Sequence, residues 1–141
     1  MTTSFNFKDK TVFIFGGTSG INLGIARSFA SAGANVSVAS RSEDKVAAAV
    51  KELQALGSES HGYSLDVRDA EAVAAGLQQF HAALGDFDVL VSGAAGNFPA
   101  LMAKMSVNAF RTVVEIDLMG TVHVLKGAYP YLKRPGGNII N

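Results

Sequence analysis

A short turn near the N-terminus combines glycines with Thr and Ser at a spacing suited to holding a phosphate group. It follows the apolar run Thr11–Phe15, which predicts a buried strand, and it opens into a helical pattern. Glycine lets the main chain approach a ligand closely, and a helix N-terminus offers free N–H groups and a positive dipole to an anion. We predict a nucleotide phosphate site formed by Gly16, Thr18, Ser19, Gly20, Ile21 and Asn22.

Two other interpretations of the glycines at 16, 20 and 24 stay open at this point. A tight turn that holds no ligand has the same composition. Glycines four residues apart also occur where two membrane helices pack together, but Arg27 and several Ser residues interrupt the surrounding apolar stretch. The polar residues that follow the later strands discriminate among these interpretations.

Strand-like and helix-like segments alternate along the rest of the chain. Apolar runs predict further strands at residues 35–39, 62–65, 88–92 and 137–141. A 3.6-residue spacing of apolar side chains predicts helices between them, the last of which covers residues 106–132. The two clearest apolar helix faces are Val46, Val50, Leu53 and Leu56, and Val73, Leu77, Phe80 and Leu84. The expected helix N-caps and stops are Ser42, Gly57, Asp69 and Gly85.

Strands that alternate with helices, without hairpin signals, predict an α/β fold. We expect a doubly wound parallel sheet of about five strands joined by right-handed crossovers. Ligands bind such sheets at the carboxyl ends of the strands. The first four strand ends, at residues 15–17, 39–41, 65–67 and 92–96, are therefore expected to converge on one crevice.

The composition is that of one ordinary globular domain of 141 residues, with 48% hydrophobic and 17% charged residues. A formal net charge of zero without a Lys/Arg cluster argues against a nucleic-acid or membrane partner. The chain has no Cys and its three His are far apart, so no metal site is expected. Residues 1–10 lack an apolar signal core, which favours a cytoplasmic location.

The glycine turn resembles the T-G-x-x-x-G-x-G turn of the short-chain dehydrogenases/reductases, with Phe15 in place of the Thr and Asn22 in place of the third Gly. Two further motifs carry the likeness, which spans nearly the whole chain. Residues 65–67 (Leu-Asp-Val) are similar to the Asp-Val after the family's third strand. Residues 92–96 (Ser-Gly-Ala-Ala-Gly) occupy the place of the family's Asn-Asn-Ala-Gly, from which Ser92 and Gly93 depart.

This resemblance implies a Rossmann fold, with residues 1–141 forming a dinucleotide-binding domain. It implies that Asp66 and Val67 contact the adenine, although a turn or helix-capping carboxylate is the alternative for Asp66. The further cofactor residues that it implies are Gly93, Ala94, Ala95 and Gly96.

The end of the second predicted strand bears on the choice of cofactor. Enzymes that prefer NAD usually carry Asp or Glu there to accept hydrogen bonds from the ribose hydroxyls, whereas a ribose phosphate requires a cation. Here the strand ends in Ser40 and Arg41. Arg41 offers a forked set of donors and can stack on the adenine, with a solvated loop arginine as the alternative. We therefore predict NADPH, bound in part by Ser40 and Arg41.

Within the family the chain is most similar to the 2,4-dienoyl-CoA reductases of the peroxisomal type. The likeness rests on residues 94–98, 108–110, 115–117 and 120–121. Asp117 stands where most short-chain reductases have Asn, a departure shared with the peroxisomal-type enzymes. The resemblance implies a reductase that transfers a hydride to a conjugated enoyl- or dienoyl-CoA thioester and then delivers a proton to carbon.

In that chemistry Asn97 is expected to donate to the thioester oxygen or to position the nicotinamide ring, and Phe98 to contact the substrate. Asp117, if buried, would relay a proton through water. The alternative for Asp117 is a polar residue that satisfies backbone groups at a helix break before Gly120. Two other functions remain alternatives: a 3-oxoacyl or other carbonyl reductase of the same family, and a nucleotide-binding module without catalysis.

Tyr129 and Lys133 match the spacing of the family's catalytic Y-x-x-x-K pair, but they precede the fifth strand, whereas the family's pair follows it. We interpret them as surface or packing residues. The family pattern continues past Asn141 into a catalytic Ser, Tyr and Lys. We therefore expect these residues to be the incomplete N-terminal part of a longer protein, inactive on their own.

Apolar residues occupy more than one face of the segment 106–132, which a helix covering a sheet does not require. The family resemblance implies that this helix packs against a symmetry mate. We expect a homodimer or homotetramer for the complete protein.

Overall fold

The predicted apolar runs form five strands of one parallel sheet in the computed structural model, which describes residues 5–141. The strands are β1 Thr11–Phe15, β2 Asn35–Ser40, β3 Gly62–Ser64, β4 Val89–Ser92 and β5 Asn138–Ile140. The α-helices are α1 Gly20–Ser31, α2 Glu43–Ala55, α3 Ala70–Leu84, α4 Val107–Val114 and α5 Gly120–Ala128. Shorter helical segments are η1 Met102–Lys104, η2 Glu115–Met119 and η3 Tyr129–Tyr131.

The strand order is β3-β2-β1-β4-β5, with every neighbouring pair parallel. The chain therefore winds outward from β1 in one direction and then returns to add β4 on its other side. Phe15 at the end of β1 is in register with Ala39 of β2 and with Ser92 of β4. This confirms the predicted doubly wound fold and places its topological switch point between β1 and β4.

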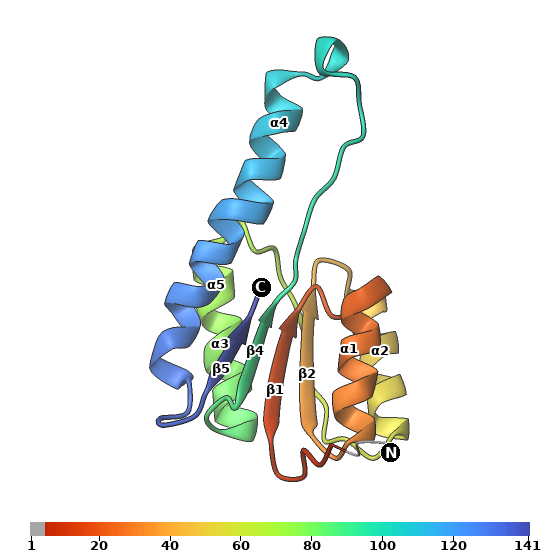
Figure 1. The fold of residues 1–141 in the computed structure, drawn as a ribbon, viewed down its shortest axis with the longest axis vertical. Coiled ribbons are helices and arrows are strands. Elements are labelled where there is room, and N and C mark those ends of the chain that lie inside the picture. The colour runs from red at the N-terminus through yellow and green to blue at the C-terminus, as the bar shows by residue number, and fades with distance from the viewer. Residues whose placement is uncertain (1–4) are drawn as a thin grey trace.

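Helices cover both faces of the sheet (Figure 1), with α1 and α2 on one side and α3 and α5 on the other. The alternation of side chains along β1 explains why both faces need cover. Val12 and Ile14 pack with the residues under α1 and α2, whereas Phe13 and Phe15 pack with those of α3 and α5. Residues 12–15 are continuously apolar because both faces of β1 are buried.

Aromatic rings dominate the side of the core under α3. Phe13 and Phe80 have ring centroids 4.5 Å apart, as do Phe80 and Phe87, and all three side chains are fully buried. Burial of one such side chain stabilises the fold by roughly 2–3 kcal/mol. This cluster fixes α3 against β1 and β4, the two strands that flank the switch point.

The long helical segment expected over residues 106–132 is not one regular α-helix. Its middle, η2, is π-helical and joins α4 to α5 without a break, and η3 ends it. The interpretation of a helix break before Gly120 is therefore wrong. Figure 1 shows α4 projecting beyond the carboxyl end of the sheet, beside the extended chain that follows β4.

The predicted helix caps are confirmed, but one expected apolar face is shorter than predicted. The Ser42 and Asp69 side chains accept hydrogen bonds from the first turns of α2 and α3. Leu56, expected on the buried face of α2, is 43% exposed because the helix ends at Ala55 and the chain turns away there. Ala49 takes a buried place on that face instead.

Asp88 links three chain segments at the amino end of the sheet. Its carboxylate accepts hydrogen bonds from the Thr11 N–H at 3.0 Å, from Lys10 Nζ at 3.1 Å and from Lys133 Nζ at 3.4 Å. Burial raises the pKa of Asp88, but these hydrogen bonds and the charge of Lys133 outweigh that effect. The pKa lies below its ordinary value.

No helix among residues 5–141 is long and apolar enough to cross a membrane.

Replacing Asp88 by Asn should destabilise the protein by about 2 kcal/mol, since the charged hydrogen bonds are lost in a buried place. Because the folded-state pKa is depressed, the stabilisation is present above the ordinary Asp pKa of about 4 and is lost as pH falls through the lower folded value. Urea unfolding at neutral and acidic pH should therefore show a smaller pH dependence for Asp88→Asn. The control is Asp9→Asn at an exposed residue whose positive φ Asn tolerates. An equal loss of stability in both variants would contradict this role for Asp88.

Candidate functional site

A crevice of about 300 Å³ lies at the carboxyl ends of the first four strands, as expected. The predicted site residues that line it are Gly16, Thr18, Ser19, Asn22, Ser40, Arg41, Asp66, Val67, Gly93, Ala94 and Ala95. They come from four different loops, so the parallel sheet brings together residues that are far apart in sequence. A crevice of this size is at the lower end of the range for small-molecule sites.

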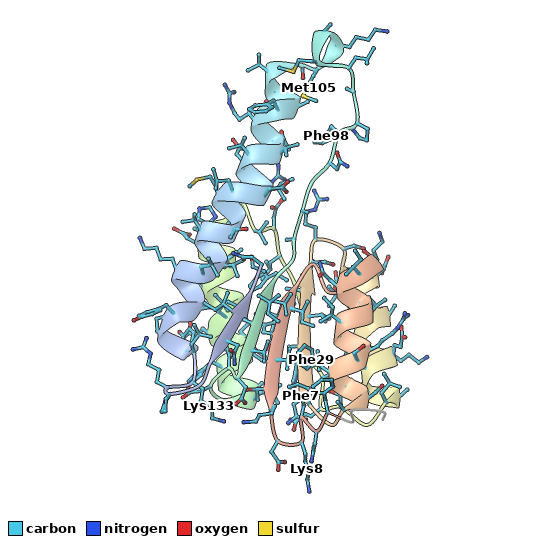
Figure 2. All side chains as sticks on the ribbon, viewed as in Figure 1. Phe7, Lys8, Phe29, Phe98, Met105 and Lys133 are labelled. Carbon is cyan, nitrogen blue, oxygen red and sulfur yellow. The ribbon has the colours of Figure 1, made fainter. Side chains whose placement is uncertain are left out.

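The remaining predicted residues lie outside the crevice lining. Gly20 begins α1, and the side chain of Ile21, the next residue, is 85% exposed. Asn97 and Phe98 lie on the exposed chain beyond β4. Figure 2 shows Phe98 well above the sheet, near the height of α4.

The glycine turn is held against two neighbouring strands. Gly16 has a φ of +74° and donates its N–H to the Ala39 carbonyl at 2.7 Å. A Cβ at Gly16 would stand 2.8 Å from the Gly93 carbonyl oxygen, so only glycine fits between β1 and the end of β4. The Thr18 hydroxyl donates to the Ser40 hydroxyl at 2.9 Å and ties the turn to β2. These contacts aim the N-terminus of α1 at the crevice.

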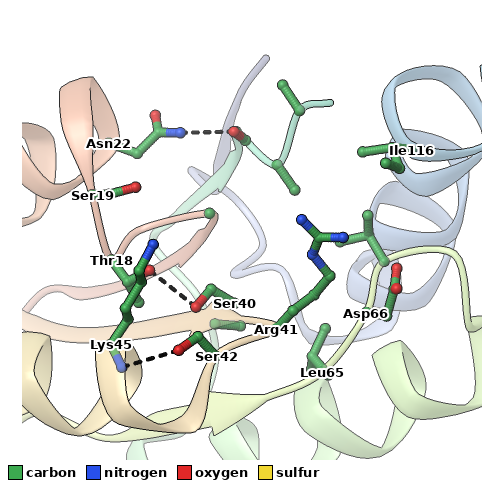
Figure 3. A pocket seen from close by; sticks show the side chains of 16 residues that line it. Thr18, Ser19, Asn22, Ser40, Arg41, Ser42, Lys45, Leu65, Asp66 and Ile116 are labelled. Carbon is green, nitrogen blue, oxygen red and sulfur yellow. Dashed lines mark hydrogen bonds between the residues drawn. The ribbon is translucent and has the colours of Figure 1, made fainter. Parts of the chain in front are cut away.

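Arg41 gives the crevice its positive charge at the end of β2. Figure 3 shows its side chain rising from the strand end into the mouth of the crevice, with Asn22 on one side and Ile116 on the other. Lys45, in the first turn of α2, also lines the crevice. Lys45 was not predicted from the sequence, although its place three residues after the N-cap Ser42 indicates a side chain near the same strand end.

Asp66 is both a turn carboxylate and a crevice residue. It accepts a hydrogen bond from the Arg68 N–H at 3.0 Å, and the Arg68 guanidinium contacts both of its oxygens, with Nε 3.1 and 3.0 Å away. Arg68 holds the pKa of Asp66 below its ordinary value against the opposing effect of burial, and the charge of Arg41 acts in the same direction. The carboxylate is therefore ionised and largely neutralised by arginine.

Val67 holds the loop after β3 against α5. Its carbonyl oxygen lies 2.8 Å from His123 Nδ1, and a Cβ at Gly120 would meet the Val67 side chain at 2.7 Å. The small residue at position 120 thus lets the helix approach the loop. Val67 is 7% exposed, so burial in the core is enough to explain why this residue is apolar, with or without a ligand.

The π-helical segment η2 places two adjacent residues against the loop after β4. Asp117 Oδ1 accepts a hydrogen bond from the Gly96 N–H at 2.7 Å. Ile116 lines the crevice, and a Cβ at Gly96 would lie 2.7 Å from its Cδ1. The Asp117 side chain is exposed, whereas a role in proton relay was expected only if it were buried. Its carboxylate satisfies a backbone group of the loop, not one of its own helix.

The pair Tyr129 and Lys133 lies away from the crevice. Lys133 contacts Asp88 at the amino end of the sheet, and Figure 2 shows it at the end of the molecule opposite Phe98. Tyr129 is 62% exposed and packs under the guanidinium of Arg134, 4.2 Å from its ring centroid. These are the surface and packing roles expected from their place before β5.

The sequence of the chain matches a known protein family. The model of the family described as short chain dehydrogenase matches residues 10–141. The chain belongs to the short-chain dehydrogenase family. All four motif-bearing strand ends fall inside the matched range.

Among curated relatives, the rat protein named peroxisomal 2,4-dienoyl-CoA reductase is 40% identical over 136 residues, which are 95% of this chain and 47% of the rat protein. The Arabidopsis thaliana protein of the same name is 35% identical over 143 residues, with 95% and 48% covered. The chain thus spans about half the length of these relatives.

A solved structure that is similar in fold was determined with a nucleotide bound. L-sorbose reductase from Gluconobacter frateurii, complexed with NADPH and L-sorbose, superposes with a TM-score of 0.88 at 26% identity. The match covers 97% of this chain and 53% of that protein. The Rossmann architecture expected from the sequence is confirmed by this likeness and by the strand order.

Replacing Asp117 by Ala should release the Gly96 amide. Its hydrogen exchange should become about five to ten times faster, because the replacement removes the acceptor of a single hydrogen bond. Asp117→Asn keeps an oxygen acceptor at the same place and should leave exchange slow. Exchange at Gly96 followed by NMR in the three proteins checks this, and identical rates would show that the bond does not hold the loop.

Proposed function

We propose that the protein is an NADPH-dependent short-chain reductase in which residues 1–141 act as the dinucleotide-binding domain. The observation that carries this is the position of Arg41, whose guanidinium enters the crevice directly beyond Ser40 at the end of β2. A ribose 2′-phosphate needs a cation at that strand end. Lys45 adds a second cation, and Arg68 pairs with Asp66, the carboxylate that lines the crevice.

The residues of the glycine turn fit a dinucleotide. Gly16 and Gly93 lie close together and have no side chains, so the main chain forms this part of the crevice floor. The N-terminal N–H groups of α1, at residues 20–22, would bind the diphosphate, and Ser19 lies at the same helix end. Ser40 and Arg41 would hold the phosphorylated ribose, with Asp66 and Val67 beside the adenine. Bound NADPH would supply the hydride.

We propose a conjugated enoyl- or dienoyl-CoA thioester as the substrate. Support comes from the names of the rat and Arabidopsis thaliana relatives, at 40% and 35% identity. In this proposal Asn97 donates an amide hydrogen to the thioester oxygen and Phe98 contacts the acyl chain. Asp117 accepts a hydrogen bond from the Gly96 N–H and thereby orients the adjacent Asn97.

The exposed apolar side chains of the long helix support a homo-oligomer, either a dimer or a tetramer. Exposed fractions are 75% for Val107, 57% for Phe110 and 60% for Leu118. Side chains of this kind along one projecting helix are typical of a surface that another chain covers. The location expected from the sequence, the cytoplasm, stays a prediction, while the relatives' names point to the peroxisome.

Consumption of NADPH by the complete protein, with a 2,4-dienoyl-CoA and with a 3-oxoacyl thioester, tests the substrate, since residues 1–141 are expected to be inactive on their own. We expect oxidation of NADPH with the dienoyl-CoA at a kcat/KM at least about tenfold above that with the 3-oxoacyl thioester, a difference of about 1.4 kcal/mol in transition-state binding. The reverse preference would assign a carbonyl reductase. NADPH binding without turnover of either thioester would assign a nucleotide-binding module.

Arg41→Asp should weaken NADPH far more than NADH. Loss of a charged hydrogen-bond partner and gain of a repelling carboxylate together should raise the Kd for NADPH by about a hundredfold, with a small change for NADH. Titration calorimetry with both nucleotides measures this, and Arg27→Gln serves as the control arginine because Arg27 pairs with Glu52 and does not line the crevice. Equal losses for the two nucleotides would remove the argument for a phosphate at Arg41.

A further inference from the structure

Two departures from the family pattern meet at one point of this structure. Asn22 stands in place of the third glycine of the turn, and Gly93 stands where the family's loop after β4 has a second Asn. The two positions are 71 residues apart in sequence, yet Asn22 Nδ2 donates to the Gly93 carbonyl oxygen at 2.7 Å. Figure 3 shows this bond bridging α1 and the end of β4.

The space between α1 and the loop holds one side chain, not two. A Cβ at Gly93 would lie 2.3 Å from Asn22 Nδ2, 2.6 Å from Cγ and 2.7 Å from Oδ1. The whole carboxamide of Asn22 therefore occupies the volume that a side chain at position 93 would need. The glycine that permits close packing of helix and strand has moved from the helix to the strand end.

The Gly93 carbonyl is a junction between three elements. Its oxygen would lie 2.8 Å from a Cβ at Gly16, and the Gly93 N–H donates to the Phe15 carbonyl at 3.1 Å. Asn22 thus closes a set of contacts among β1, β4 and the first turn of α1, at the switch point of the sheet. Both Asn22 and Gly93 line the crevice.

We infer that Asn22 and Gly93 form a compensating pair in which Asn22 acts as a positioning residue for the diphosphate and nicotinamide half of the cofactor. The inference rests on the proposed binding of NADPH. The pair lies on the β1 and β4 side of the crevice, whereas Arg41 and Asp66 follow β2 and β3 on the other side. Disturbing the pair therefore affects the whole dinucleotide more than its adenosine end.

The test uses a swap of the two residues and two probes. The variants are Asn22→Gly, Gly93→Asn and the double variant with both changes, compared with the natural protein. The probes are NADPH and adenosine 2′-monophosphate, which carries the adenosine and its 2′-phosphate but neither phosphate of the diphosphate. The matched control is Gly24→Ala, because a Cβ at that residue of α1 meets nothing within 4 Å. Calorimetry gives the Kd values and thermal unfolding gives the stabilities.

Each single variant should raise the Kd for NADPH about tenfold, Asn22→Gly by losing the bond and Gly93→Asn by crowding. The double variant should return to within about threefold of the natural protein, as one side chain again fills the space. Binding of adenosine 2′-monophosphate should change less than about twofold throughout, as should both probes in Gly24→Ala.

Other outcomes overturn the inference. Losses that add in the double variant would show that the two residues do not compensate. Equal losses for both probes, in step with melting temperature, would show a purely structural contact. If the natural protein binds neither probe, the proposed function fails and the inference fails with it, whereas unchanged binding in all variants refutes the pair alone.

Discussion

The close approach of β1 and β4 at the switch point is the constraint on which the crevice depends. The sheet adds strands outward on both sides of β1, so the loops after β1 and β4 must diverge from almost the same point. Gly16 and Gly93 permit this, because a Cβ at Gly16 would collide with the Gly93 carbonyl. A bulky residue at Gly16 would separate the strand ends, close the crevice floor and turn the N-terminus of α1 away from it.

The loop after β4 is held from both sides of the crevice. Asn22 binds the Gly93 carbonyl from α1, and Asp117 binds the Gly96 N–H from η2. The π-helical turn brings Ile116 onto the crevice while Asp117 reaches the loop. Irregular helix of this kind is frequent at functional sites, since it shifts side chains out of the regular register. Four residues of main chain, from Gly93 to Gly96, thus join the contact with α1 to the contact with η2.

Much of this arrangement could be predicted from local sequence patterns. Continuous apolar runs predicted the strands, because a parallel sheet buries both of its faces. Ligands bind such sheets at the carboxyl ends of the strands, and this placed Arg41 and Asp66 in one crevice. The π-helical turn escaped prediction because a 3.6-residue pattern does not reveal one extra residue in a turn. Lys45 and Ile116 escaped because their side chains reach the crevice only through the packing of α2 and η2. Leu56 was predicted to be buried, but it is exposed because α2 ends one residue before it, at Ala55.

A crystal structure of the protein with NADPH would show directly where the dinucleotide lies in the crevice. We expect diphosphate oxygens within hydrogen-bonding distance of the N–H groups at residues 20–22. We also expect the 2′-phosphate on the Arg41 guanidinium and the nicotinamide half beside the hydrogen bond between Asn22 and Gly93. A dinucleotide whose diphosphate lies away from the N-terminus of α1, or whose ribose phosphate avoids Arg41, would contradict the proposed binding of NADPH.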